Sequence, residues 1–415
     1  MLRITYISIE PFRIAGSLIS MKKALAVFVG VIVFFSCQRS DPNPGNTFFT
    51  LTTNAQAIQL ANSWIFATDK LGNVLDVQPG LGTIQLRSTM SVPDSINITL
   101  LTSSMGGSCR LSTYVGIPKN SILQESSNLP VPTKLQTGKA TITISDYSEN
   151  PNVGNLLTFS DGYSDIIGKY ATDSHTGFET MTLLAGYDSI LVSGYNDLTP
   201  VYRWFPRVVD GDQINASFST FLTYPKTVAI DFDGVISGYV SGLTSDNPWG
   251  GLFFGNIFTF KSPAMIGYLD GYSRYSTYIR LNATSGATVV YEKTGTINPH
   301  VSLPAFDFKA TDTMINNFQF TFAGDYTYNC VTWSNGTTTP SVTWQVYTSK
   351  TSIPGVVSVP AALSSRFPSL RLENLKYAGV DFIKLLDGST FNDFAMKSLT
   401  TLGQQPVERI TFSYH

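Results

Sequence analysis

The residues best suited to acid–base chemistry are two aspartates separated by one position. Asp231 and Asp233 lie in residues 227–233, whose alternating polarity predicts a β-strand. Side chains at i and i+2 of a strand share a face, with backbones roughly 6.6 Å apart, and paired carboxylates at such distances carry out glycoside hydrolysis. The same pair offers oxygen ligands for calcium, but the loop that follows lacks further oxygen ligands at alternate positions.

The residues around this pair argue against catalysis. Residues 230–234 (IDFDG) resemble the aspartate ladder of chitinase-type hydrolases, which ends in a catalytic glutamate two residues after its last aspartate. Val235 occupies that position here. An Asp-Gly sequence also favours a turn, which leaves both carboxylates on the solvent face of the strand. We therefore expect no enzyme activity and no catalytic residue, with a glycoside hydrolase-like enzyme using Asp231 and Asp233 as an alternative.

The scarcity of histidine restricts other catalytic and metal-binding chemistry. The chain contains three histidines, His175, His300 and His415, and no HExxH sequence. Residues 238–242 (GYVSG) place the serine one position too late for a nucleophile elbow. No CxxC sequence or cluster of cysteine and histidine is present. The sequence therefore predicts neither a metal site nor a cofactor.

Aromatic side chains are the most plentiful candidates for ligand binding. They make up 13% of the chain and are densest in segments rich in Gly, Asn and Ser, namely residues 202–206, 247–254 and 271–278. Flat rings beside amide side chains suit a sugar, whose apolar face stacks on a ring, and they suit a protein partner equally well. Trp249 and Trp204 are the predicted binding residues. The other tryptophans lie in alternating segments and are expected in the core: Trp64, Trp333 and Trp344.

Two cysteines in the main part of the chain allow two arrangements. Cys109 and Cys330 are far apart in sequence, and an exported protein can join such a pair in a disulfide. Free cysteines are also commonly buried as small apolar side chains. The sequence leaves both arrangements open.

The N-terminal region has the layout of a secretory signal that ends at a cysteine. Two lysines precede an apolar run over residues 24–35, and Ser36 is the small residue before Cys37. The run is shorter than the roughly 20 residues that cross a bilayer as a helix. This layout resembles the signal and lipobox of Gram-negative cell-envelope lipoproteins, although Phe35 stands where small residues are commoner.

The resemblance implies that Cys37 is the lipid attachment site at the mature N-terminus. In such lipoproteins an aspartate after the cysteine tends to retain the protein at the inner membrane, and Gln38 occupies that position here. It therefore implies an outer-membrane location, on either face. We expect translation to begin at Met21, with residues 21–36 as the signal peptide, because residues 1–20 would place the signal's lysines in mid-segment.

Charge and composition exclude two further classes of protein. Without residues 1–36, the Lys and Arg count falls from 27 to 23 and the Asp and Glu count from 29 to 28, so the mature chain carries about −5. The charges form no basic stripe, and we expect no nucleic-acid partner. With 43% apolar residues, the chain can bury two or three cores and is not disordered. Residues 38–46 (QRSDPNPGN) alone have the composition of a tether.

An alternation of apolar and polar residues dominates the rest of the chain. Such alternation is typical of half-buried antiparallel strands. It covers residues 94–100, 139–147, 227–233 and 409–414. Two hairpins are also predicted, one over residues 64–77 and one over residues 332–344, the second with Asn335-Gly336 at its turn. Helices are predicted only at residues 361–366 and at residues 393–402, the latter with Asn392 as its N-cap.

These elements predict an all-β protein. We expect two or three antiparallel β-sandwich domains, immunoglobulin-like or jelly-roll-like, with one or two short helices near the C-terminus. Proline-containing breaks at residues 128–133 and 244–248 suggest the boundaries. The expected order is a tether over residues 37–47, followed by domains over residues 48–130, 131–245 and 246–415.

Together, these features predict a non-catalytic, lipid-anchored envelope protein that presents β-sandwich domains to a ligand or partner. The expected partners are the membrane, through the N-terminal lipid, and a glycan or an envelope protein. A surface glycan-binding accessory protein is one alternative, and a glycoside hydrolase-like enzyme is another. Fold class alone does not choose among them.

Overall fold

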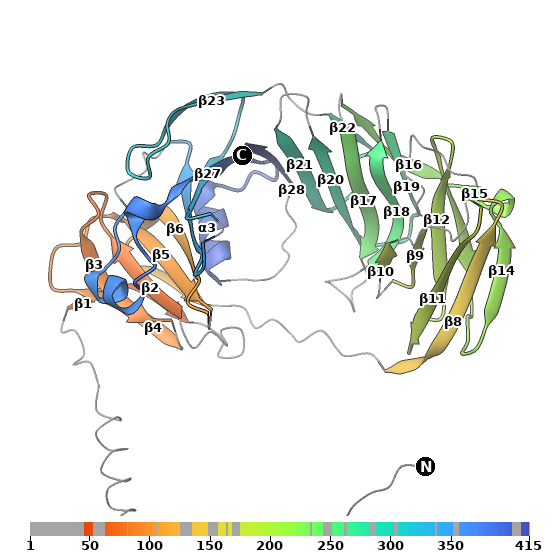
Figure 1. The fold of residues 1–415 in the computed structure, drawn as a ribbon, viewed down its shortest axis with the longest axis horizontal. Helices are drawn as coiled ribbons and strands as arrows, with labels where there is room; N and C mark the ends of the chain where they lie inside the picture. Colours follow the sequence, from red (N-terminus) through yellow and green to blue (C-terminus); the bar gives the residue numbers. More distant parts are fainter. Residues whose placement is uncertain are drawn as a thin grey trace, which may run out of the picture.

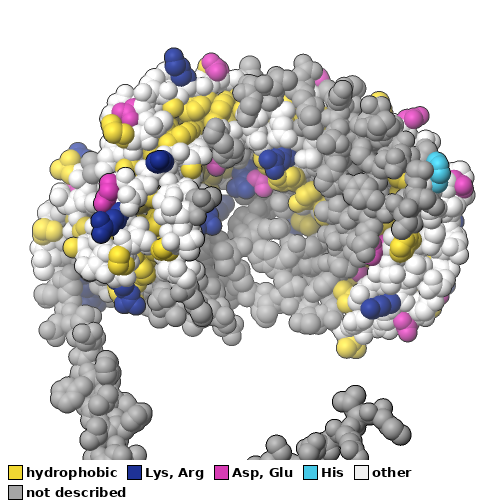
Figure 2. All heavy atoms as spheres, viewed as in Figure 1, with side chains coloured by type: hydrophobic (Ala, Val, Ile, Leu, Met, Phe, Trp, Pro, Cys, Tyr) yellow, Lys and Arg dark blue, Asp and Glu magenta, His cyan; other side chains and the backbone are white. Residues whose placement is uncertain are grey.

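The described residues form a protein built almost entirely of β-strands, which confirms the predicted all-β class (Figure 1). The computed structural model describes residues 45–52, 63–80, 82–104, 106–124, 135–147, 157–162, 165–167, 175–232, 235–243, 251–260, 264–282, 287–302, 306–336, 338–351, 357–400 and 408–414. The strands gather into two lobes that are joined along one side (Figure 1). Figure 2 shows charged side chains scattered over this face in small groups rather than in one large patch.

One large sheet runs through both lobes. Among the described residues it has twelve strands in the order β18-β17-β20-β21-β28-β27-β25-β26-β6-β5-β2-β3. The strands are β2 Ser63–Thr68, β3 Val74–Pro79, β5 Ser95–Ser103, β6 Cys109–Pro118, β17 Val235–Leu243, β18 Gly251–Phe260, β20 Arg274–Asn282, β21 Thr288–Gly295, β25 Tyr328–Ser334, β26 Val342–Ser349, β27 Lys376–Leu385 and β28 Glu408–Tyr414. Neighbouring strands are antiparallel except β26 and β6, which are parallel.

In the lobe that contains β1, both faces of this sheet are covered. One face packs against a small sheet of β1 Asn46–Thr52, β4 Thr83–Ser88 and β7 Ser121–Gln124, and against helix α3 Phe391–Thr400. The ribbon of β23 Asp307–Asp312 and β24 Gln319–Ala323 lies on the other face, where Phe322 stacks on Phe382 of β27 at 4.1 Å. Helix α2 Ala361–Arg366 packs there too, and is followed by the 3-10 turn η2 Leu372–Asn374.

The second lobe has three layers. The outer sheet contains β8 Gln136–Ser145, β11 Gly177–Leu184 and β14 Gln213–Ser217. The middle sheet contains β9 Thr158–Ser160, β10 Asp165–Ile167, β12 Ile190–Asn196, β13 Thr199–Phe205 and β15 Leu222–Thr223, with the 3-10 turn η1 Phe218–Thr220 before β15. Two further groups of strands share a core with the middle sheet and are together called the third layer: the separate sheet of β16 Lys226–Asp231, β19 Ala264–Tyr268 and β22 His300–Ser302, and strands β17, β18, β20 and β21 of the large sheet.

Side chains on both faces of β12 are buried, which explains why its sheet is the middle layer. Val192 packs into the core shared with the outer sheet, which includes Ile142. Leu191, pointing the other way, packs into the core that contains Val228 and Phe254 of the third layer. Successive side chains of a strand point to opposite faces of its sheet. A strand whose side chains are buried on both faces must therefore lie between two layers.

The predicted strands and the predicted tryptophan hairpin are confirmed. Residues 139–147 correspond to β8, whose Ile142 and Ile144 are buried. Trp333 of β25 and Trp344 of β26 lie directly opposite each other and are buried. The hairpin is closed by Asn335, whose side-chain oxygen accepts a hydrogen bond of 2.8 Å from the backbone N–H of Val342.

Of the two helices, α2 has the predicted bounds and α3 begins two residues earlier than predicted. Thr390, not Asn392, caps α3. The Thr390 hydroxyl oxygen accepts a hydrogen bond from the Asp393 backbone N–H at 3.2 Å, and the Thr390 N–H donates to the Asp393 carboxylate at 2.8 Å. This reciprocal arrangement satisfies two groups at once, which a single asparagine cap cannot do.

Strand pairing crosses both of the expected domain boundaries. Hairpin β17–β18 spans residues 245 and 246, and β6 pairs with β26 on the far side of both boundaries. The first lobe is therefore assembled from residues 45–124 and 306–414, with the second lobe inserted between them. The proline-containing segments lie outside the described residues, and the lobes are set by pairing between distant strands.

The disulfide considered between Cys109 and Cys330 is absent, and both residues are free, buried thiols. Both cysteines can be placed along β26, where Cys109 aligns with Val342 and Cys330 with Tyr347. These positions are five residues apart, an odd number, so the two thiols point to opposite faces of the sheet. They are also about 16 Å apart along the strand, far beyond the ~7 Å Cα separation that a disulfide tolerates.

The α-helices of the described residues, at six and ten residues, are too short to span a bilayer. Met21, the signal peptide and Cys37 lie outside the described residues. The lipid attachment therefore stays a prediction from the sequence.

We predict that Cys109 and Cys330 of the folded protein, purified without reductant, do not react with a water-soluble thiol reagent. Burial raises the pKa of the Cys330 thiol to about 12 and also raises that of Cys109, so neither forms a reactive thiolate at neutral pH. Denaturation without reductant should expose both thiols, measured by mass spectrometry after alkylation. An increase in alkylated thiols on adding reductant would show that a disulfide is present.

Candidate functional site

The three aromatic segments singled out in the sequence converge in the second lobe. Tyr202 of β13 packs on Tyr224 with ring centroids 4.6 Å apart. The Tyr224 hydroxyl donates a hydrogen bond to the backbone oxygen of Phe254 in β18, and the Phe254 ring contacts Tyr272 at 5.3 Å. We call Tyr202, Tyr224, Phe254, Tyr268, Tyr272 and Tyr275 the tyrosine cluster. It joins the middle sheet to the third layer.

Two glycines make room for these rings. A Cβ atom on Gly267 would lie 2.2 Å from the Tyr224 ring, and one on Gly242 would lie 2.4 Å from the Tyr272 ring. Both distances are shorter than any tolerated carbon contact, so the rings rest directly on the backbone of β19 and β17. Glycine at such strand positions is the feature that permits this close approach.

The buried tyrosine hydroxyls in the cluster and beside it are neutral. Burial raises the pKa of Tyr224 well above its ordinary value, and its oxygen lies 2.6 Å from the Ser193 hydroxyl. Tyr195 also has a pKa raised by burial, and its hydroxyl donates to the backbone oxygen of Met265 at 2.9 Å. These groups remain protonated at neutral pH, so they act as hydrogen-bonding groups and not as bases.

The outer part of the cluster combines rings with an ion pair. Tyr268 and Tyr275 meet edge to face with centroids 5.8 Å apart, and both are half-buried. The Tyr275 hydroxyl donates to the backbone oxygen of Leu269 at 3.1 Å. Lys226, directly opposite Tyr268, forms an exposed ion pair of 2.7 Å with Asp270. This border therefore offers apolar ring surface beside charged and hydroxyl groups.

Trp204, one of the two predicted binding residues, lies beside the cluster next to Tyr202. It follows Tyr202 on the same face of β13 and is 39% exposed. Leu222 of β15, paired with Tyr202, is also exposed. The other predicted binding residue, Trp249, lies outside the described residues.

The remaining tryptophans have different environments. Trp333 and Trp344 are core residues, as expected. Trp64 is only half-buried, and the Arg366 guanidinium of α2 lies 5.2 Å from the centre of its ring. This tryptophan therefore lies at the edge of the core beneath a cation rather than inside it.

The structure describes only one member of the predicted carboxylate pair. Asp231 is exposed at the end of β16, and Asp233 lies outside the described residues. Within the described ranges, no group of three or more His, Cys, Asp or Glu side chains could hold a metal ion. His175 and His300 are exposed, and His415 lies outside the described part of the chain.

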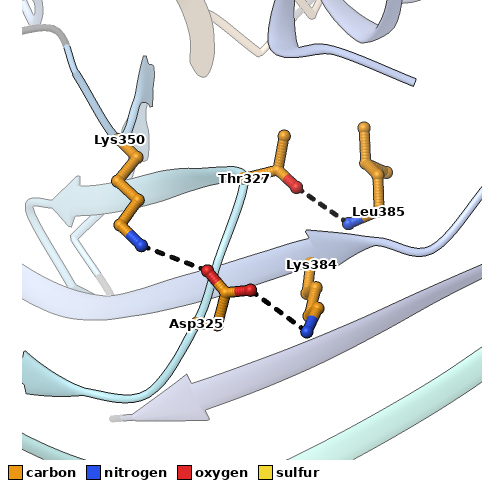
Figure 3. Close-up of polar contacts among 5 residues, drawn as sticks. All are labelled: Asp325, Thr327, Lys350, Lys384 and Leu385. Carbon is orange, nitrogen blue, oxygen red and sulfur yellow. Dashed lines mark hydrogen bonds and ion pairs between the residues drawn. The ribbon is translucent and has the colours of Figure 1, made fainter. Parts of the chain in front are cut away.

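A charged cluster that sequence reasoning missed lies in the first lobe (Figure 3). Asp325 lies between Lys350 and Lys384, with an oxygen 3.1 Å from each ammonium nitrogen. Thr327 supports the same turn, since its hydroxyl oxygen accepts a 3.0 Å hydrogen bond from the backbone N–H of Leu385. Sequence patterns gave no signal because the two lysines are distant from Asp325 in the chain. The cluster ties the turn between β24 and β25 to the ends of β26 and β27.

We predict that Tyr224→Phe lowers the free energy of unfolding by about 1–3 kcal/mol, because the Phe254 carbonyl and the Ser193 hydroxyl lose a buried partner. Urea denaturation measures this change. Tyr268→Phe is the matched control, since its half-buried ring lies at the cluster border. Equal destabilisation by both substitutions would contradict the role assigned to the Tyr224 hydroxyl.

We predict that Asp325→Asn lowers the free energy of unfolding at pH 7 by at most about 1 kcal/mol, since the ion pairs are exposed. Hydrogen bonds from Lys350 and Lys384 lower the pKa of Asp325. The ion pairs therefore stabilise the folded protein fully above the ordinary pKa of aspartate. This stabilisation is lost as the pH falls through the lowered pKa of Asp325. Denaturation at several pH values should show wild type and variant converging at acid pH. A difference that grows on acidification would contradict this assignment.

No protein-family model, curated protein or solved structure matches this chain.

Proposed function

We propose that this chain is a non-catalytic, lipid-anchored protein of the outer membrane that binds a glycan at the exposed border of the tyrosine cluster. The observation that carries the proposal is the convergence of three aromatic segments, with Trp204 exposed beside Tyr202 at their border. The N-terminal signal that ends at Cys37 supports the anchor.

The chemistry of this border favours a sugar. An exposed indole and half-buried tyrosine rings present apolar area, on which the C–H face of a sugar ring stacks. On the Tyr268 side of the cluster, the Lys226–Asp270 pair adds a hydrogen-bond donor and an acceptor for hydroxyl groups. A protein partner also uses exposed aromatics, but a small number of oriented polar groups around rings is typical of small-molecule sites.

The buried tyrosines support binding rather than proton transfer. Their hydroxyl groups already donate to backbone oxygens or lie within hydrogen-bond distance of Ser193. Such bonds hold the rings in fixed positions, so little side-chain entropy is lost when a ligand stacks on the border. The site is therefore preorganised for a rigid, ring-shaped ligand.

The first test is a binding screen of the protein against a panel of polysaccharides and oligosaccharides, with a product assay on every hit. We predict that Trp204→Ala weakens binding of the recovered glycan by about twofold to tenfold, the range expected for one aromatic contact of about 0.5–1.5 kcal/mol. Calorimetry on the folded variant measures the loss.

Phe178→Ala is the matched control. Phe178 lies on β11 of the outer sheet and is 41% exposed, close to the value for Trp204. An equal effect of both substitutions, or no glycan bound by the protein, would contradict the proposed site. If the wild-type protein converts the glycan to a product and Asp231→Asn does not, the protein is an enzyme and the binding proposal is wrong.

A further inference from the structure

The described chain begins beside a pocket at one end of the first lobe. The pocket has a volume of about 680 Å³ and is lined by residues 45–48, 88–92 and 119–120. Gly45 lies flat against the end of β4, because a Cβ atom there would be 2.3 Å from the Ser88 carbonyl carbon. This contact fixes the place where the preceding segment enters the fold.

The rim of this pocket has side chains that suit a lipid surface. Met90 lines the pocket and is 60% exposed. Ile122, two residues after the pocket-lining Asn120, is 79% exposed, which is high for a branched apolar side chain. Lys119, which also lines the pocket, supplies an ammonium group that forms an exposed ion pair of 2.5 Å with Asp94. Hydroxyl groups of Ser88, Thr89 and Ser91 complete the polar lining.

The length of chain before Gly45 limits how far this end can lie from a lipid anchor. Eight residues separate Cys37 from Gly45. Fully extended, eight residues reach at most about 28 Å, and a flexible chain of that length spans on average about 16 Å. A lipid on Cys37 therefore keeps the Met90–Lys119–Ile122 rim within a few nanometres of the bilayer.

We infer that the surface formed by Met90, Lys119 and Ile122 docks on the outer-membrane bilayer, so that the first lobe stands on the membrane. This inference rests on the proposed anchor at Cys37. Apolar side chains at the headgroup boundary and a cation near lipid phosphates are the elements of interfacial binding. A single acyl signal is reinforced by such a second contact.

The test uses the acylated full-length protein on vesicles of phosphatidylethanolamine and phosphatidylglycerol. Met90→Cys and Ile122→Cys are labelled with a water-soluble thiol reagent, and each rate is compared with that of the same variant carrying Cys37→Ser. The native Cys109 and Cys330 are buried and do not interfere. Met314→Cys is the matched control, since Met314 is 64% exposed between β23 and β24, and β23 lies on the opposite side of the lobe from β1 (Figure 1).

We expect the anchored protein to lose labelling at positions 90 and 122 and to keep it at position 314. Equal labelling at all three positions in an acylated protein would overturn the docking surface and leave the anchor intact. Acylation itself is measured on the same preparation with a fatty-acid probe. Absence of the probe from the protein with Cys37 present would overturn the anchor, and the docking inference with it.

Discussion

The pairing of β21 with β28 is the contact on which the joined sheet depends. Six residue pairs align these strands, and cross-strand ion pairs reinforce them: Glu292 with Arg409, and Lys293 with Glu408 at 2.9 Å. Glu408 also accepts a 2.7 Å hydrogen bond from the Tyr291 hydroxyl. Opposite charges placed directly across an antiparallel pair favour this register over a shifted one. Because β28 also pairs with β27, the strands of the two lobes form one continuous sheet (Figure 1).

The candidate binding surface depends on the same layers. The tyrosine cluster belongs to the core that continues through the large sheet to Trp333 and Trp344, so its rings are held by packing on both sides. Only its border, where Trp204 lies, is available to a ligand. A site built on strands rather than on a long loop positions its side chains more accurately, at the cost of adaptability. This geometry fits recognition of a rigid ligand better than accommodation of many partners.

Local features of the fold could be predicted from the sequence, and long-range ones could not. Alternation located β8 and β28, and the Asn335-Gly336 turn located the hairpin that pairs Trp333 with Trp344, because these patterns depend on neighbouring residues. The meeting of Tyr202 with Tyr224 and Phe254 depends on how sheets stack, which no local pattern records. The two arrangements of Cys109 and Cys330 were distinguishable only after the register of β26 was known.

The parallel pairing of β6 with β26 has a consequence for how the protein is made. Cys109 of β6 aligns with Val342 of β26, so more than two hundred residues separate neighbours in the sheet. Because the chain is made from its N-terminus, β6 is synthesised long before its partner, and its open edge is exposed during that interval. Contacts of such high sequence separation also make folding slow. A chaperone that shields strand edges would therefore benefit this chain most before β26 has been made, whereas the folded protein, in which β26 covers β6, does not need one.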